Sequence, residues 1–143
     1  MADTGAVDAA LLDLLRADAA LLGICPDGIQ YGIADPAAQR FVLVDRLDHS
    51  VDLRMFGAAA GEGFVYLVKA VLPEPTSRNA REAARLIRAR LDGAVGLAAD
   101  GFALMAPIAE IESVRLVEVD ESHPERRVQH WGGQYSVLVQ RTN

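Results

Sequence analysis

Apolar positions near the start of the chain follow the spacing of one helical face. Residues 7–16 predict an amphipathic helix because apolar side chains recur there every three or four positions. Those side chains are Val7, Leu11, Leu14 and Leu15. Asp18 is placed to cap a second, short helical turn over 19–22, which Gly23 and Pro26 would end. The chain is therefore expected to open with two helical segments.

Beyond residue 40 the pattern changes from helical to alternating. Residues 41–47 form a β-branched and aromatic run, and residues 51–55 alternate apolar with charged side chains beyond the polar stretch 48–50. We expect these two runs to pair as antiparallel strands around a turn at 48–50. Residues 64–72 are apolar on both alternating faces, with Lys69 as their one charge. This predicts a central strand that is covered on each side.

Between these strands lies a stretch of small residues. Residues 57–63 comprise three glycines, three alanines and one glutamate, so they offer little to anchor them to a core. Gly61 and Glu62 belong to a Gly-Glu-Gly step that lacks both the third glycine and the strand-to-helix setting of a nucleotide-binding loop. We interpret the stretch as a mobile loop that becomes ordered when a partner binds.

A second amphipathic helix is expected after Pro75. Asn79 and Glu82 match a capping box, the pattern continues to Leu91, and Gly93 is placed to end the helix. The predicted buried stripe consists of Ala80, Ala83, Ala84, Ile87 and Leu91.

An arginine row lies opposite that stripe. Its members are Arg78, Arg81, Arg85 and Arg88. Such a row can bind an acidic neighbour across a subunit interface, although charged residues opposite an apolar stripe are also typical of the solvated side of a helix. Glu82 and Arg85 are spaced for a local ion pair that would neutralise part of the charge.

The last third of the chain predicts a second hairpin. Strands over 114–119 and 128–140 flank a polar turn at 121–125, and a phase slip within the first strand suggests a β-bulge there. The order of elements favours an α+β fold in one domain, 1–143. It would consist of an antiparallel sheet of about four to five strands, with an N-terminal helix and a central helix packed on one face.

Trp131 stands beside two glycines inside the last predicted strand. Gly132 and Gly133 weaken a strand and leave bare backbone next to the only tryptophan, so something is expected to approach closely. A helix of the same chain, a β-bulge and a neighbouring subunit all remain open.

Composition limits the classes of function. The net charge of −6 disfavours tight nucleic-acid binding, and the single Cys25 excludes an internal disulfide framework. The acidic N-terminus and the absence of a long apolar run indicate neither a secretion signal nor a membrane span. We therefore expect a soluble protein made in a reducing cytosol.

Residues that carry chemistry do not converge in the sequence. His49, His123 and His130 are scattered, and the acidic cluster at 120–125 fits a solvated hairpin tip better than a cation site. We expect no enzyme activity and no catalytic, cofactor or metal site. The alternative from another class is a small-molecule-binding domain or enzyme with a pocket between sheet and helix, using His130 or Glu112.

The order of these segments resembles the tail-completion and tail-terminator proteins of long-tailed bacteriophages and phage-like particles. The resemblance covers the leading helix with its alanine-aspartate-alanine step at 17–19, the strand-helix unit at 64–93, and the closing hairpin with its glycine-containing strand at 130–137. It implies a ring, commonly of six copies, at the head-proximal end of the tail tube.

In that family the ring stops tube polymerisation and joins the tail to the head. The resemblance therefore implies that the partners are further copies of the chain, the tail tube protein and a head-side connector, with DNA passing through the lumen without specific binding. The location would be the neck region of the virion, after synthesis in the host cytoplasm. The alternative within structural proteins is a head-tail connector or adaptor. The candidate subunit-interface residues are Arg78, Arg81, Arg85, Arg88, Gly61, Glu62, His123 and Trp131.

Overall fold

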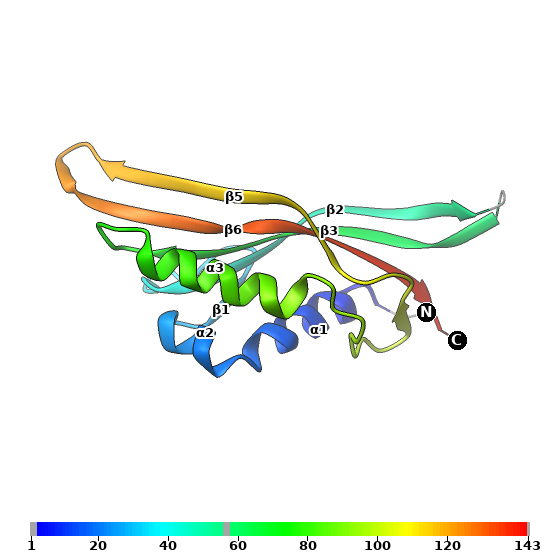
Figure 1. Cartoon of the computed structure of the whole chain (residues 1–143). Helices are drawn as coiled ribbons and strands as arrows, with labels where there is room; N and C mark the ends of the chain where they lie inside the picture. Colours follow the sequence, from blue (N-terminus) through cyan, green and yellow to red (C-terminus); the bar gives the residue numbers. More distant parts are fainter. Residues whose placement is uncertain (1–2, 56–57, 143) are drawn as a thin grey trace.

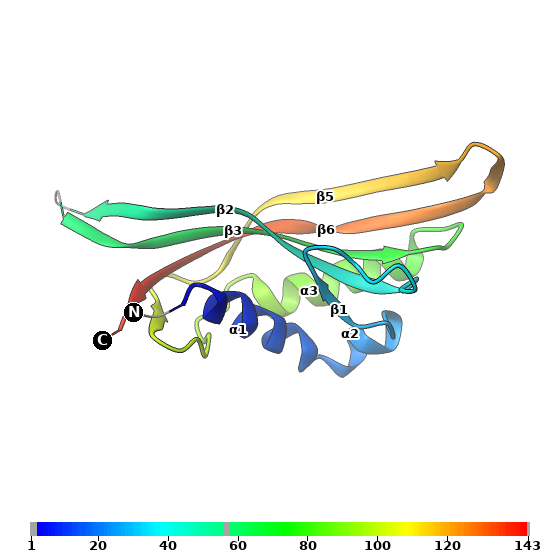
Figure 2. The ribbon, with the colours of Figure 1, turned by 180° about the vertical axis from the view of Figure 1, so that it is seen from behind.

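The structure is a computed structural model that describes residues 3–55 and 58–142. These residues form one long sheet with helices on a single face (Figures 1 and 2). The elements in chain order are α1 (Gly5–Arg16), α2 (Ala19–Ile24), β1 (Ile29–Tyr31), β2 (Phe41–Met55), β3 (Ala58–Leu72), α3 (Arg78–Leu91), β4 (Phe102–Leu104), β5 (Ala109–Asp120) and β6 (His123–Arg141).

The sheet has six strands in the described residues. Its order is β1-β2-β3-β6-β4, and β5 also pairs with β6. Only β1 runs parallel to its neighbour, β2, while the other pairs are antiparallel. The α+β prediction is confirmed, with helices on one face. The additional strands β1 and β4 span three residues each, which is too short for a two-residue period to show in the sequence.

The helices follow the predicted stripes except at Leu14 and Ala84, which are only half-buried. In α1 the buried residues are Val7, Ala10, Leu11 and Leu15, and in α3 they are Ala80, Ala83, Ile87 and Leu91. The Asp18 carboxylate caps α2 by accepting a 3.1 Å hydrogen bond from the Leu21 amide, as predicted. Gly93 adopts the left-handed conformation (φ 82°) that ends α3.

The predicted capping box at the start of α3 is wrong. The N-cap is Ser77, without a side-chain hydrogen bond. The Asn79 amide instead donates to both carboxylate oxygens of Glu74, at 2.9 and 3.0 Å. Glu82 accepts hydrogen bonds from Arg85.

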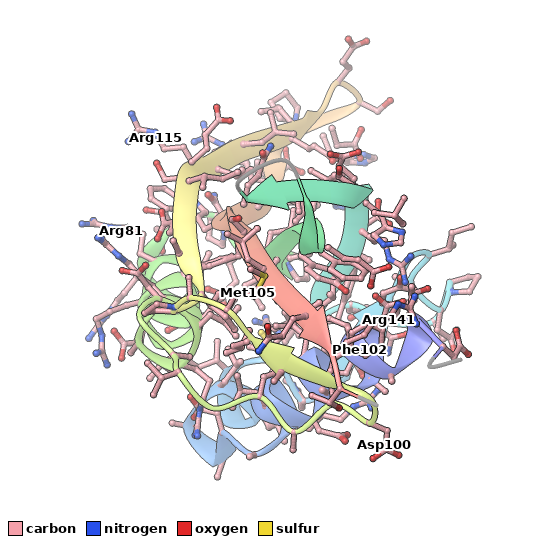
Figure 3. The ribbon with its side chains drawn as sticks, turned by 90° about the vertical axis from the view of Figure 1, so that its right-hand side faces the viewer. Arg81, Asp100, Phe102, Met105, Arg115 and Arg141 are labelled. Atoms are coloured by element: carbon pink, nitrogen blue, oxygen red, sulfur yellow. The ribbon has the colours of Figure 1, made fainter. Side chains whose placement is uncertain are left out.

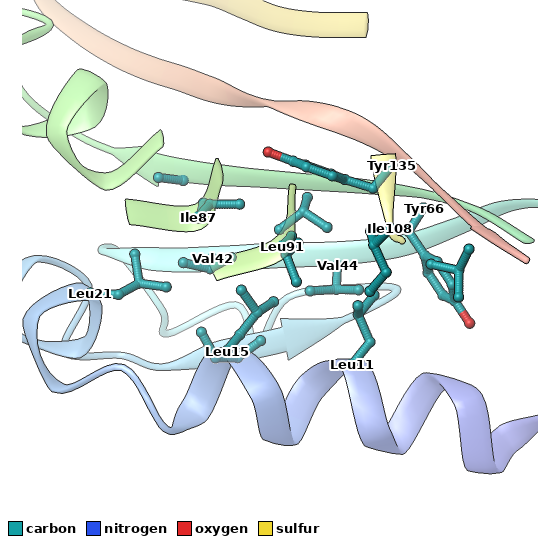
Figure 4. Close-up of a cluster of buried hydrophobic side chains, with 14 of the residues drawn as sticks. Leu11, Leu15, Leu21, Val42, Val44, Tyr66, Ile87, Leu91, Ile108 and Tyr135 are labelled. Carbon is teal, nitrogen blue, oxygen red and sulfur yellow. The ribbon is translucent and has the colours of Figure 1, made fainter. Parts of the chain in front are cut away.

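The core lies between the helices and one face of the sheet (Figure 4). Leu11, Leu15 and Leu21 from the first two helices meet Val42 and Val44 of β2. The other labelled core side chains are Tyr66, Ile87, Leu91, Ile108 and Tyr135. Burying these side chains removes large apolar areas from water, which is the main stabilising contribution to such a fold.

The opposite face of the sheet has no helix over it among the described residues. In β3, Phe64, Tyr66 and Val68 are buried, whereas the alternate residues Val65 and Leu67 are half-buried. The prediction of a central strand covered on both faces is therefore wrong. Val71, near the end of β3 on that second face, is buried and lines a hollow together with Ala38 and Gln39 of the segment before β2.

Strands β2 and β3 form one long hairpin, which corrects two predictions. The predicted turn at 48–50 lies inside β2, which pairs with β3 along its length except for three register shifts: beside Leu47, between Ser50 and Leu53, and between Leu53 and Arg54. The predicted loop at 57–63 is also wrong, because 58–63 open β3, while Gly57 lies outside the described residues. The outer part of this hairpin, residues 45–55 and 58–67, is called the β2–β3 wing below.

Small residues suit this part of β3 for a steric reason. A Cβ atom at Gly61 would lie 2.4 Å from both the Val139 carbonyl oxygen and the Met105 sulfur. A strand that runs this close to its neighbours needs glycine, and its ladder of backbone hydrogen bonds needs no side-chain anchor.

The second hairpin, β5–β6, is confirmed, but its bulge is elsewhere. Residues 114–119 pair with β6 in unbroken register, and the shifts occur between Glu110 and Glu112 and after Val119. The phase slip in 114–119 has another cause, since the outer part of the hairpin is exposed on both faces and neither face selects an apolar set. This outer part, residues 115–127, is called the β5–β6 wing. The two wings project from opposite ends of the molecule (Figure 1).

Candidate subunit interface

A groove of about 470 Å³ separates α3 from the hairpin β5–β6. Its charged and aromatic lining includes four arginines and the only tryptophan of the chain. We call Arg81, Arg85, Arg88, Arg115 and Trp131 the arginine groove.

Local structure explains why these side chains share one groove. Arg81, Arg85 and Arg88 lie four and three residues apart on α3, so they occupy one helical face. Arg115 comes from β5, where it stands opposite Trp131 of β6 in the strand register. Figure 3 shows Arg81 and Arg115 on the same side of the molecule, with both side chains pointing away from the core.

Trp131 lies within reach of two cations. The guanidinium carbon of Arg81 is 5.9 Å from the centroid of the indole ring, and that of Arg115 is 6.0 Å from it. The indole N–H donates to the Gln129 side-chain oxygen at 3.3 Å, which fixes the ring's orientation. Cation–π contacts of this kind contribute about 0.5–1 kcal/mol each at exposed positions. The tryptophan therefore helps to hold two positive charges near each other.

The arginines differ in how far they are neutralised. Arg85 pairs with Glu82 at 2.6 Å, and Arg88 lies 3.3 Å from Glu110. For Arg81 and Arg115 we find no ion pair with a carboxylate in the part of the chain that is described. The groove thus presents two charges that are available to an anionic partner.

Arg78 lies outside this groove. It borders a second hollow, of about 550 Å³, at the start of α3, together with Thr76, Ser77, Arg81 and Arg85. The arginine row of the sequence is therefore divided between two adjacent surfaces.

Gly61 and Glu62 do not join the groove. Glu62 is only 6% exposed, and its carboxylate lies 3.0 Å from Arg141 and 3.9 Å from the His49 Nε2 atom. Gly61 is enclosed by Val139 and Met105. Both residues serve contacts within the chain.

His123 is exposed at the tip of the β5–β6 wing. Its Nδ1 atom lies 3.5 Å from Asp120. No group of three or more His, Cys, Asp or Glu side chains in the described residues is arranged to hold a metal ion.

The glycines beside Trp131 have a different explanation from those considered in the sequence. A Cβ atom at Gly132 would lie 2.0 Å from the Val68 carbonyl oxygen and 2.5 Å from the Lys69 Cα atom. The close neighbour is therefore the backbone of β3. At Gly133 the nearest atoms are the Glu112 carbonyl oxygen at 3.0 Å and the Glu110 side chain at 3.2 Å.

The residues of the alternative small-molecule site are separated. Glu112 is exposed and stands opposite Gln134, whereas His130 is buried and stands opposite Leu116. Burial, with the positive charge of Lys69, lowers the pKa of His130, although Glu118 at 2.7 Å opposes that shift. His130 and Glu112 therefore do not converge on one substrate position.

Asp8 is the centre of a side-chain hydrogen-bond cluster between α1 and the sheet. Its carboxylate on α1 accepts hydrogen bonds from the Tyr31 hydroxyl at 2.8 Å, the Tyr66 hydroxyl at 2.5 Å, and the Arg46 guanidinium at 3.1 and 2.5 Å. Burial and the hydrogen bond to Asp8 raise the pKa of Tyr66. The cluster joins α1 to three strands and leaves Asp8 with its charge balanced, so we assign it a structural role.

None of the described helices is long and apolar enough to cross a bilayer. A scan of protein-family models and a search of curated proteins both return no match.

Among solved structures, the fold is similar to that of a chain in a structure titled "Virion of native gene transfer agent (GTA) particle". The TM-score is 0.62, the sequence identity is 21%, and the alignment covers 94% of this chain and 96% of the other. The similarity extends over nearly the whole of both chains and concerns the fold.

Proposed function

We propose that this chain is a structural subunit of a phage or phage-like virion, and specifically a tail terminator. It forms a ring at the head-proximal end of the tail tube, ends tube polymerisation and joins the tail to the head-side connector. Its role is assembly, without catalysis.

The observation that carries the proposal is the fold shared with a chain of the gene transfer agent virion. The match covers 94% of this chain and 96% of the other, so the shared fold spans nearly all of both compared chains. This supports a comparable place in a particle, and the sequence resemblance to tail-terminator proteins supports the finer assignment.

The exposed strands give physical support for assembly. In the described sheet β5 pairs with β6 alone, so its other edge offers unpaired backbone groups. Large apolar side chains are also exposed on both hairpins: Leu47 and Val51 on β2, and Ile111, Leu116, Val117 and Val119 on β5. Long apolar edges of this kind favour association with further chains.

The shape supports a ring over a two-fold dimer. Different surfaces at opposite ends of one elongated subunit suit head-to-tail contacts, which close into a ring when the rotation per subunit divides a full turn. The net charge of −6 is compatible with a lumen through which DNA slides without being held.

Native mass spectrometry and negative-stain imaging test this proposal. The purified protein is expected to form a ring, and the ring is expected to bind one end of tubes assembled from the tail tube protein and to halt their growth. A protein that stays monomeric at all concentrations and never associates with tubes would refute it. Capture of the connector without tube ends would indicate the adaptor role instead.

A further inference from the structure

The arginine groove has two cations that lack an acidic partner among the described residues. Arg81 and Arg115 are both exposed, and both lie about 6 Å from the centroid of the Trp131 ring. Arginine's planar guanidinium forms paired hydrogen bonds with carboxylates while stacking on an aromatic ring. The surface therefore fits a segment that carries carboxylates next to an apolar side chain.

Such a segment occurs on β2. Asp45, Leu47 and Asp48, which we call the acidic edge, lie where the β2–β3 wing leaves the helix layer. The register shift beside Leu47 places Asp45 opposite Leu67 and Asp48 opposite Val65, so both carboxylates lie on the sheet face without helices. Leu47 is 47% exposed.

The two basic groups closest in sequence to the acidic edge point elsewhere. Arg46 pairs with Asp8 and lies over the Phe64 ring, with its guanidinium carbon 5.2 Å from the centroid. His49 stacks on the same ring at 4.4 Å. We find no ion pair for Asp45 or Asp48 in residues 3–55 and 58–142. Their charges are not neutralised within the subunit.

We infer that the arginine groove of one copy binds the acidic edge of the next copy in the ring. This inference rests on the proposed ring. Asp45 and Asp48 supply carboxylates to Arg81 and Arg115, and Leu47 packs near Trp131. The arginine groove and the acidic edge are different surfaces, so the contact is heterologous. Until the ring closes, each growing oligomer therefore has one free groove at one end and one free acidic edge at the other.

The other acidic segment of the chain fits the groove less well. At the tip of the β5–β6 wing, Glu121 and Glu125 are exposed, but Arg126 and Arg127 follow directly. A segment with both signs of charge gains less from a cationic groove than the acidic edge, whose exposed side chains are negative or apolar.

Charge reversal on each surface, and then on both, tests the inference. Variant A carries Arg81→Glu and Arg115→Glu, and variant B carries Asp45→Arg and Asp48→Arg. Each is expected to raise the concentration at which half of the rings dissociate by at least about tenfold, since close charge pairs at interfaces contribute 1.4 kcal/mol or more. Mass photometry and the fluorescence of the single Trp131 report the transition.

Recombining the charges is the decisive step. A chain with all four substitutions is expected to form rings again, because its groove is acidic and its edge is basic. Mixing A with B is expected to give rings of alternating subunits in equal amounts, at a concentration at which each variant alone stays dissociated. If a variant failed to assemble only because it is unfolded, neither the fourfold substitution nor the mixing of A with B would restore rings.

Matched controls separate this inference from the proposed function. Arg126→Glu with Arg127→Glu changes the net charge as variant A does, but at the wing tip, and should leave the rings intact. Rings that tolerate variants A and B as well as this control would overturn the inference and leave the proposed function standing. Intact rings that no longer bind tubes or connector would also overturn it, by assigning the groove to that partner. A wild-type chain without rings would refute both.

Discussion

Replacing Asp8 by alanine is predicted to destabilise the fold by about 3 kcal/mol. The substitution removes the carboxylate that accepts four hydrogen bonds. The Arg46 guanidinium and the Tyr66 hydroxyl then lose this hydrogen-bond acceptor. The Asp8 side chain is 13% exposed and that of Arg46 is 23% exposed. Breaking a fully buried ion pair costs about 3–5 kcal/mol, and breaking an exposed ion pair costs at most about 1 kcal/mol. Because both side chains are mostly buried, the cost for Asp8 and Arg46 lies nearer the value for a buried ion pair.

Urea unfolding followed by far-UV circular dichroism measures the effect. With a denaturant slope of about 2 kcal/mol per molar, a loss of about 3 kcal/mol lowers the midpoint by roughly 1.5 M. Tyr66→Phe removes one hydroxyl and should cost about 1 kcal/mol, and the exposed Tyr31→Phe should cost less. The protein concentration must stay fixed, because assembly makes apparent stability depend on it.

The relative sizes of these stability losses test the role of the Asp8 carboxylate. Asp13→Ala, at an exposed position of the same helix, is the matched control and should hardly move the midpoint. If Asp8→Ala shifted the midpoint no more than Tyr66→Phe does, the carboxylate would not be holding α1 on the sheet.

Two further predictions concern the core. Gly132→Ala should prevent accumulation of soluble protein, because its Cβ would overlap the β3 backbone, whereas Gly133→Ala, with its nearest atom at 3.0 Å, should remain soluble. Burial raises the pKa of the Cys25 thiol from 9.0 to about 12, so the unfolded chain loses its proton first. The unfolding free energy should therefore be constant with respect to this thiol below pH 9 and fall as the pH rises toward 12. In pH-dependent urea titrations, Cys25→Ala should reduce that fall, and an unchanged slope would contradict the burial.

The helices were predictable from sequence because each packs one stripe against the sheet. That contact selects apolar side chains at a helical period, as in Leu11 and Leu15 or Ile87 and Leu91. The wings follow a different rule. Asp48 and Ser50 are exposed in β2, and on an exposed strand a polar composition cannot be told from that of a turn.

Part of the arginine groove could be predicted from the sequence in the same way. Arg81, Arg85 and Arg88 share a helical face, which spacing alone reveals. Arg115 was missed because its place beside Trp131 depends on the register of β5 against β6. Alternation in β5 gives no signal for this position, because residues 115–120 are exposed on both faces of the hairpin.

The continuity of β2 and β3 from the core into the wing has a mechanical consequence. Both strands span fifteen residues without a break in the chain's direction, and their hydrogen bonds lie across the strand axis. A pull along that axis loads these bonds in shear, so many must fail together. A pull at right angles would open them one at a time from the tip. The wing is therefore stiff toward tension along the sheet and compliant toward peeling.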